Sequence, residues 1–187
     1  LAVKMTAEQA LQMDAWLIHY STDYVFDGQG NMPWRETDIA APLNHYGESK
    51  LAGEQAIQAS GCKHLIFRTS WVFAERGQNF AKTMLRLAKD REELSVIADQ
   101  IGAPTGADLI ADITALALQK SLTRPELAGL YHLAASGEVS WHGYACHVLG
   151  FAKANGEELA VQTISPINAV AYPSPARRPL NSRLNTQ

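Results

Sequence analysis

Residues 16–26 read WLIHYSTDYVF, and this stretch decides the fold because it opens a strand–helix–strand unit. It is rich in aromatic and β-branched residues and ends at Asp27-Gly28, which predicts a strand followed by a turn. After a loop rich in glycine and proline, residues recur at helical spacing from 46 to about 60, and Gly61 is placed to end that helix. A second strand is predicted at residues 64–73, HLIFRTSWVF.

The rest of the chain continues this alternation. Ser140 is the expected N-cap of the last helix. Further helices are predicted at residues 79–90, 107–122 and 140–156, and further strands at residues 94–99, 129–135 and 160–164. Strands that alternate with helices of this length predict an α/β fold, in which crossover helices connect the strands of a parallel sheet.

Composition narrows the classes of function. The chain has 187 residues, 47% of them hydrophobic, and a domain of this length buries roughly 70% of the surface that its unfolded chain exposes. Its formal net charge is −3, and the only adjacent basic pair is Arg177 with Arg178. The sequence has no stripe of basic residues that could bind along a phosphate backbone, so we expect no nucleic-acid partner.

The sequence also predicts a cytoplasmic protein without a membrane partner. No run approaches the eighteen or so apolar residues of a membrane span, and no stretch has the pattern of a signal peptide. Cys62 and Cys146 are far apart and have no CxxC spacing, so we expect two reduced, buried thiols rather than a disulfide or a zinc site.

Three residues form a pattern typical of proton transfer to a carbonyl group. Tyr46 and Lys50 are four positions apart, so they lie one turn apart on the same face of the predicted helix. A nearby ammonium stabilises a phenolate, and Lys50 should therefore ease proton donation by Tyr46. Thr22 lies near the carboxyl end of the first strand, where α/β sheets bind ligands, and its hydroxyl is suited to orient a carbonyl oxygen.

Five segments extend this pattern to almost the whole chain. They are HYSTDYVFDG at 19–28, PLNHYGESKLAGE at 42–54, FRTSWVF at 67–73, NFAKTMLRLA at 79–88 and DQIGAPTGADLIADIT at 99–114. With YPSPARRPLNSRLNT at 172–186, they resemble the dTDP-4-dehydrorhamnose reductases, which are extended short-chain dehydrogenases/reductases. The resemblance is far more specific than the tyrosine–lysine spacing alone.

The resemblance implies a Rossmann-like sheet with a small substrate-binding subdomain, in one partial domain over residues 1–187. Residues 1 to about 100 would hold the rest of the sheet and the catalytic residues, and about 100–187 would mostly bind substrate. The implied reaction uses NADPH or NADH to reduce the C4 ketone of dTDP-4-dehydro-L-rhamnose. Thr22, Tyr46 and Lys50 would be catalytic, with Tyr46 and Lys50 also contacting the cofactor.

Seven residues are expected to contact the dTDP-sugar. Because side chains alternate along a strand, at most one of Asp23 and Tyr24 should touch the sugar directly. Trp71 is either a stacking platform or a core aromatic, and Asn79 either an N-cap or a nucleotide contact. The expected substrate-binding residues are Thr22, Asp23, Tyr24, Trp71, Asn79, Gln100 and Arg178.

The glycine pattern departs from that of the family. None of the thirteen glycines forms the glycine-rich turn that places a cofactor pyrophosphate at a helix N-terminus. We therefore expect a fragment that lacks two parts of the family's chain, the N-terminal cofactor-binding part and a short C-terminal segment. Alone, it should bind dinucleotide weakly and be inactive.

The resemblance also implies a homodimer, with Mg²⁺ between subunits and Asp108 as one ligand. Two other interpretations stay open. One is another sugar-nucleotide enzyme of this family, an epimerase or a 4,6-dehydratase, although a dehydratase usually has Glu where this chain has Tyr24. The other is a non-catalytic regulatory subunit resembling the methionine adenosyltransferase β subunit.

Overall fold

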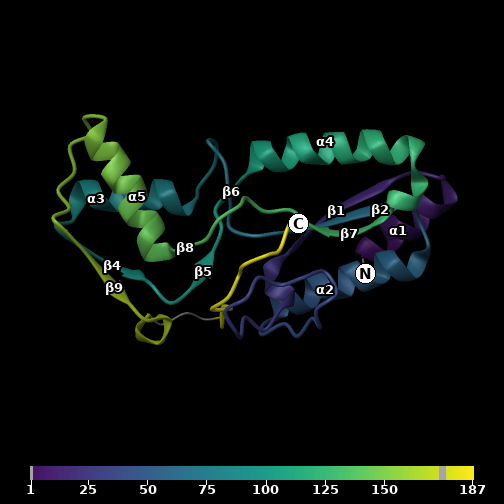
Figure 1. Ribbon diagram of the computed structural model, residues 1–187, viewed down its shortest axis with the longest axis horizontal. Coiled ribbons are helices and arrows are strands. Elements are labelled where there is room, and N and C mark those ends of the chain that lie inside the picture. Colours follow the sequence, from purple (N-terminus) through teal and green to yellow (C-terminus); the bar gives the residue numbers. More distant parts are fainter. Residues whose placement is uncertain (1, 173–175) are drawn as a thin grey trace.

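A three-stranded parallel sheet lies at the centre of one half of the molecule (Figure 1). The computed structural model describes residues 2–172 and 176–187. Leu17 pairs with His64 and Thr22 with Thr69, so the first two strands are in register along their full length. The predicted parallel sheet is confirmed, and all its carboxyl ends lie at one edge. In spatial order the strands are β1 (Leu17–Thr22), β2 (His64–Thr69) and β7 (Gly129–His132).

Helices cover both faces of this sheet (Figure 1). Strand β2 is central, so its side chains are buried on both faces and its sequence reads as a continuous apolar run. Ile66 packs in the cluster of Ala7 and Ile57, whereas Leu65 packs on the other face with Ile110. The helices are α1 (Ala2–Gln12) and α2 (His45–Ser60) on one face, and α4 (Ala107–Thr123) on the opposite face.

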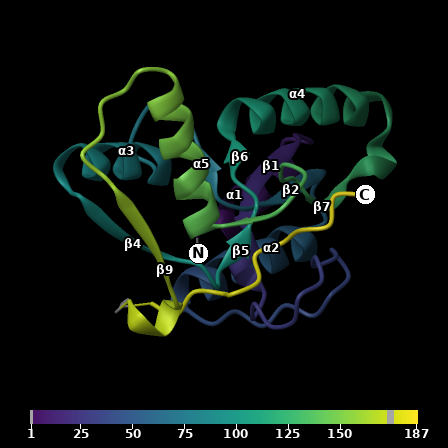
Figure 2. The same ribbon diagram turned by 60° about the vertical axis from the view of Figure 1, so that its left-hand side comes forward.

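Two helices and a pair of strands form the second half of the molecule (Figure 2), which has its own apolar core. Met84 and Ala88 pack there against Leu94 and Leu149. Short strand pairs, β3 with β6 and β5 with β8, join this half to the sheet. The remaining elements are α3 (Phe80–Asp90), α5 (Trp141–Ala154), the parallel pair β4 (Glu93–Ile97) and β9 (Thr163–Ile167), and the short strands β3 (Val72–Phe73), β5 (Ile101–Gly102), β6 (Thr105–Gly106) and β8 (Val139–Ser140).

The chain crosses between the two halves more than once. Helix α3 and strand β4 belong to the second half, but α4 and β7 return to the sheet. A single boundary near residue 100 of the chain therefore does not divide the molecule into its two halves.

Among the described residues, no helix is both long enough and apolar enough to span a membrane.

Helix ends follow the capping residues. Gly61 has φ 72° and ends α2 in the left-handed conformation that glycine adopts at low cost. Asn44 caps the start of α2 by accepting from the Gly47 N–H, and Ser140 caps α5 in the same way. The predicted end of α2 and the predicted N-cap of α5 are both confirmed.

Several boundaries differ from the prediction. The first strand ends at Thr22 because the Thr22 hydroxyl accepts the Tyr24 N–H, which turns the chain into a 3₁₀ helix at Asp23–Val25. Helix α1 was not predicted, since it is short and gains its stability from packing on α2. The last two strands, predicted at 129–135 and 160–164, lie at Gly129–His132 and Thr163–Ile167.

The two cysteines differ in environment. Cys62 is buried in the core beside Ile57, as expected. Cys146 is exposed on α5, so the prediction that it is buried was wrong. The helical pattern did not say which side of α5 faces the core.

Gly47 fixes how closely α2 approaches the turn after β1. A Cβ at this position would lie 2.2 Å from the Tyr24 carbonyl oxygen, so Gly47→Ala should force the helix away from that backbone. We expect it to lower the free energy of unfolding by about 2–4 kcal/mol. Gly150→Ala is the matched control, because its Cβ would meet nothing within 4 Å, and it should raise stability by about 0.5–1 kcal/mol. Urea unfolding of both variants is the measurement, and equal effects would contradict this account of the approach.

Candidate active site

Tyr46 and Lys50 project from the N-terminal part of α2 at the carboxyl edge of the sheet. Tyr46 is 55% exposed and lines a pocket. The Lys50 ammonium donates to the carbonyl oxygen of Tyr20 on β1 at 2.5 Å. An ammonium has three donors, and this is the one hydrogen bond of Lys50 that the structure places within the described residues. Its other donors are suited to hold neighbouring hydroxyls, as a cofactor ribose would require.

The charge of Lys50 is set by two opposing effects. Partial burial lowers the pKa of Lys50, and the Glu54 carboxylate raises it. His19 on β1 lies in the same neighbourhood, where burial and the Lys50 charge lower the pKa of His19. A neutral His19 does not repel the Lys50 ammonium. Lys50 therefore carries the positive charge at the carboxyl edge of the sheet.

Thr22 lies at the end of β1 with its hydroxyl already engaged. It donates to Asp23 Oδ1 at 3.1 Å and accepts the Tyr24 N–H at 3.2 Å. Asp23 is only 2% exposed. Burial raises the pKa of Asp23 from its ordinary value of 3.8 to about 6, against hydrogen bonds with Ser182 and Thr22 that lower it. The carboxyl group therefore faces inward beneath Thr22, and it does not lie on the open surface.

Tyr24 has the opposite orientation and lines a pocket. Its ring meets that of Tyr46 edge to face, with centroids 5.7 Å apart. Burial raises the pKa of Tyr24, and the Asp23 charge adds to the effect. Both tyrosines and Arg178 line a pocket of about 550 Å³. Of Asp23 and Tyr24, the structure thus brings only Tyr24 to this pocket.

A larger pocket of about 1040 Å³ lies between the second half of the molecule and the C-terminal segment. Gln100 and Arg178 both line it. Gln100 is buried, whereas Arg178 is exposed and also lines the smaller pocket. Arg178 therefore lies where the two pockets adjoin, as a residue that contacts a long ligand would.

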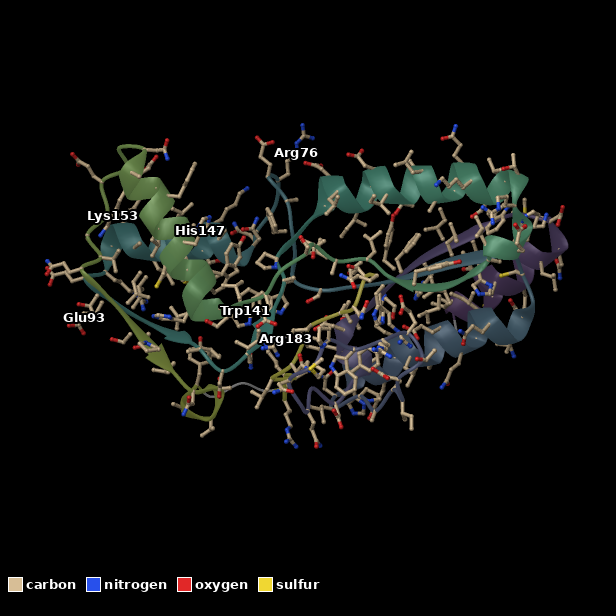
Figure 3. The ribbon with its side chains drawn as sticks, viewed as in Figure 1. Arg76, Glu93, Trp141, His147, Lys153 and Arg183 are labelled. Atoms are coloured by element: carbon tan, nitrogen blue, oxygen red, sulfur yellow. The ribbon has the colours of Figure 1, made fainter. Side chains whose placement is uncertain are left out.

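Trp71 is held in an unusual backbone conformation and contacts a residue of the larger pocket. Its φ is 48°, which is uncommon for a residue with a bulky side chain. Its ring stacks on Trp141 with centroids 3.5 Å apart and packs so closely on Gly102 that a Cβ there would lie 2.6 Å from it. Figure 3 shows Trp141 at the end of α5 nearest the rest of the molecule. Trp71 is thus part of an aromatic contact between the two halves.

Two predicted site residues have other surroundings. Asn79 caps α3: it accepts the Lys82 N–H and donates to the Ala74 carbonyl, so both ends of its side chain are engaged. Asp108 is exposed in the first turn of α4. No group of three or more His, Cys, Asp or Glu side chains placed to bind a metal occurs within residues 2–172 and 176–187. The expected Mg²⁺ site lies between subunits, so Asp108 as one of its ligands stays a prediction.

Two contacts near the site were not predicted. Trp141 lines the larger pocket beside Trp71, and its position directly after the N-cap Ser140 was the only signal in the sequence. The buried ion pair of Glu54 and Arg68 lies one turn behind Lys50. In the sequence, the ion pair was indicated only by a charged residue within the helical pattern of α2 and another within the apolar run of β2. Spacing along the sequence does not show that residues of different elements are in contact.

Known proteins resemble this chain over its whole length. The RmlD substrate binding domain matches residues 1–187. The dTDP-4-dehydrorhamnose reductase of Escherichia coli strain K12 is 60% identical over 186 residues, covering 100% of this chain and 62% of that protein. The chain therefore spans about three fifths of the length of such relatives.

Solved structures of similar proteins share the fold. A dTDP-4-dehydrorhamnose reductase from Bacillus anthracis in complex with NADP is 36% identical, with a TM-score of 0.85 over 99% of this chain and 62% of its own. One from Clostridium acetobutylicum is 33% identical, with a TM-score of 0.86 over 98% of this chain and 61% of its own. The chain belongs to the family of the RmlD substrate binding domain.

Proposed function

We propose that this chain provides the proton donor and much of the sugar-nucleotide site of an NAD(P)H-dependent reductase. The reaction is reduction of the C4 ketone of dTDP-4-dehydro-L-rhamnose to dTDP-L-rhamnose. The observation that carries the proposal is that Tyr46 and Lys50 lie one turn apart at the carboxyl edge of a parallel sheet, where such sheets bind ligands. The names of the relatives support the substrate.

Tyr46 is the proposed proton donor. Tyr46 is exposed, so its hydroxyl can approach a ketone oxygen that gains negative charge during reduction. Lys50 stabilises the phenolate left behind and holds ribose hydroxyls through its remaining donors. NADPH or NADH, when bound, supplies the hydride.

Thr22 is proposed to orient the ketone, which requires a change in its hydrogen bonding. A hydroxyl has one proton, and in the structure that proton points to Asp23. If Asp23 is protonated, its own O–H can donate to the Thr22 oxygen, and the Thr22 proton becomes available to the substrate. Asp23 thus acts through Thr22 without touching the sugar.

The pockets suggest how a dTDP-sugar lies. We assign the larger pocket to the nucleotide, with Gln100 as a contact to the base and Arg178 to the diphosphate, because a guanidinium matches phosphate geometry. The smaller pocket beside Tyr24 and Tyr46 takes the sugar. Trp71 faces the sugar only if its stack with Trp141 opens, and Asn79 acts as a cap that shapes the larger pocket.

We also propose a cytoplasmic homodimer. Exposed Leu109, Ile113 and Leu116 recur at helical spacing along α4, which supports a second copy as the partner of that helix. The reduced cysteines of the described residues fit a reducing compartment.

Tyr46→Phe tests the proposed function. In a protein with the full length of its relatives, we expect ketone reduction to fall by about 10² to 10⁴, the usual contribution of a positioned acid. Dinucleotide affinity, measured by calorimetry, should be nearly unchanged. Tyr131→Phe is the control, since the Tyr131 hydroxyl donates to the Leu127 carbonyl and Tyr131 lines neither pocket. Turnover of Tyr46→Phe close to that of the control would refute the role of Tyr46.

Asp23→Asn tests the buried carboxyl group. Because folding raises the pKa of Asp23 from 3.8 to about 6, the protonated group is tolerated below pH 4, and a penalty develops as the pH rises from about 4 to 6 and is complete above 6. The variant removes this penalty. Its free energy of unfolding, taken relative to that of the wild type, should therefore be higher at pH 8 than at pH 4, by up to about 3 kcal/mol. Chemical unfolding at both pH values is the measurement. Asp112→Asn, on the exposed side of α4, should show no such difference, and the same result for Asp23→Asn would contradict the assignment.

A further inference from the structure

A buried ion pair lies one helical turn behind Lys50. Arg68 of β2 donates to both oxygens of Glu54, from Nε at 3.0 Å and from Nη2 at 2.7 Å. Glu54 is 1% exposed and Arg68 4% exposed, so neither charge is screened by water. Tyr46, Lys50 and Glu54 are spaced by four residues, which puts all three along one side of α2.

Attachment of α2 to β2 does not by itself explain why the two buried residues are charged. Replacement of a buried ion pair by apolar side chains of similar volume is often neutral or stabilising. Here the pair is also incompletely satisfied, because Arg68 Nη1 is buried without a hydrogen bond within the described residues. A charged pair at this position therefore indicates a role for the charge itself.

The groups around Lys50 leave Glu54 as the source of negative charge. Lys50 is flanked by His19 on β1, whose pKa is lowered by burial, and by Tyr46 and Glu54 on its own helix. Arg68 faces Glu54 from β2, with its guanidinium 5.0 Å from the centre of the Phe26 ring. Phe26 in turn stacks on Trp34 at 4.6 Å, so the arginine is held between a carboxylate and an aromatic pair.

We propose that Glu54 is a positioning residue that raises the proton affinity of Lys50 at the carboxyl edge of the sheet, with Arg68 fixing the carboxylate in place. The reaction that this serves is the one proposed above, so the inference rests on the proposed function. Partial burial favours loss of the lysine proton, and Glu54 offsets that tendency. A more basic Lys50 stays an ammonium, able to hold ribose hydroxyls and to stabilise a Tyr46 phenolate, up to a higher pH.

The test measures the charge of Lys50 directly. A trace of acetic anhydride labels only unprotonated lysine, and mass spectrometry of the peptide that contains Lys50 gives the pH of half-maximal labelling. The experiment uses the protein at the full length of its relatives. In Glu54→Gln we expect that pH to fall by about half to one unit, because a negative charge is removed. In Arg68→Gln it should rise, because Glu54 keeps its charge without a cation beside it.

This pair of variants separates a charge effect from a structural one. If the ion pair only fastens α2, both variants loosen the helix and expose Lys50 to water, and the labelling pH rises in both. A rise in Glu54→Gln therefore overturns the proposal. Glu8→Gln, which removes an exposed negative charge from α1, should leave Lys50 labelling unchanged.

The double variant Glu54→Gln/Arg68→Gln protects the test against misfolding. If one single variant does not fold, the other single variant compared with the double variant still isolates the effect of one charge. With Arg68→Gln as reference, the double variant should have a lower labelling pH, and an equal or higher value overturns the proposal. The pH above which ketone reduction declines should move in the same direction as labelling. If no variant and no wild-type protein reduces the ketone, labelling still decides the role of Glu54, and the proposed function alone fails.

Discussion

The close approach of helix α2 to strand β1 is the constraint on which the site depends. Thr22 ends the strand, whereas Tyr46 and Lys50 belong to the helix, so their chemistry requires the two elements to be fixed together. Gly47 lets the helix meet the backbone at Tyr24. The hydrogen bond of Lys50 to the Tyr20 carbonyl adds a second contact. Farther along α2, the ion pair with Arg68 binds the helix to the central strand.

The second half of the molecule completes a site that the sheet begins. The C-terminal segment runs along the sheet half and toward the second half (Figure 2). Asn181 donates to the Met32 carbonyl, and Arg183 pairs with Glu138, so the segment is tied on both sides. Arg178, on the same segment, therefore reaches both pockets. The proposed ligand, with a nucleotide at one end and a sugar at the other, would need contacts in both pockets.

Sequence alone predicted the features that depend on local rules. The strand–helix–strand unit, Gly61 at the end of α2 and Ser140 at the start of α5 each follow from spacing or from a single capping residue. The prediction that Tyr46, Lys50 and Thr22 are site residues came from the same kind of pattern. Their roles remain proposals.

Features that depend on distant contacts were not predictable. Alternation along a regular strand could not reveal that Thr22 captures the Tyr24 N–H and turns Asp23 inward. The stack of Trp71 on Trp141 joins residues seventy positions apart in different halves. The pair of Glu54 and Arg68 likewise comes from two elements that only the packed fold brings together.

The central claim is that this site reduces a ketone at C4 of a dTDP-sugar. The most direct measurement is transfer of deuterium from NADPH that carries the label at the transferable position, using protein of the full length of the relatives and dTDP-4-dehydro-L-rhamnose. The account predicts one deuterium at C4 of the dTDP-L-rhamnose formed, detected by nuclear magnetic resonance. Product without deuterium at C4, or no product at all, would contradict it.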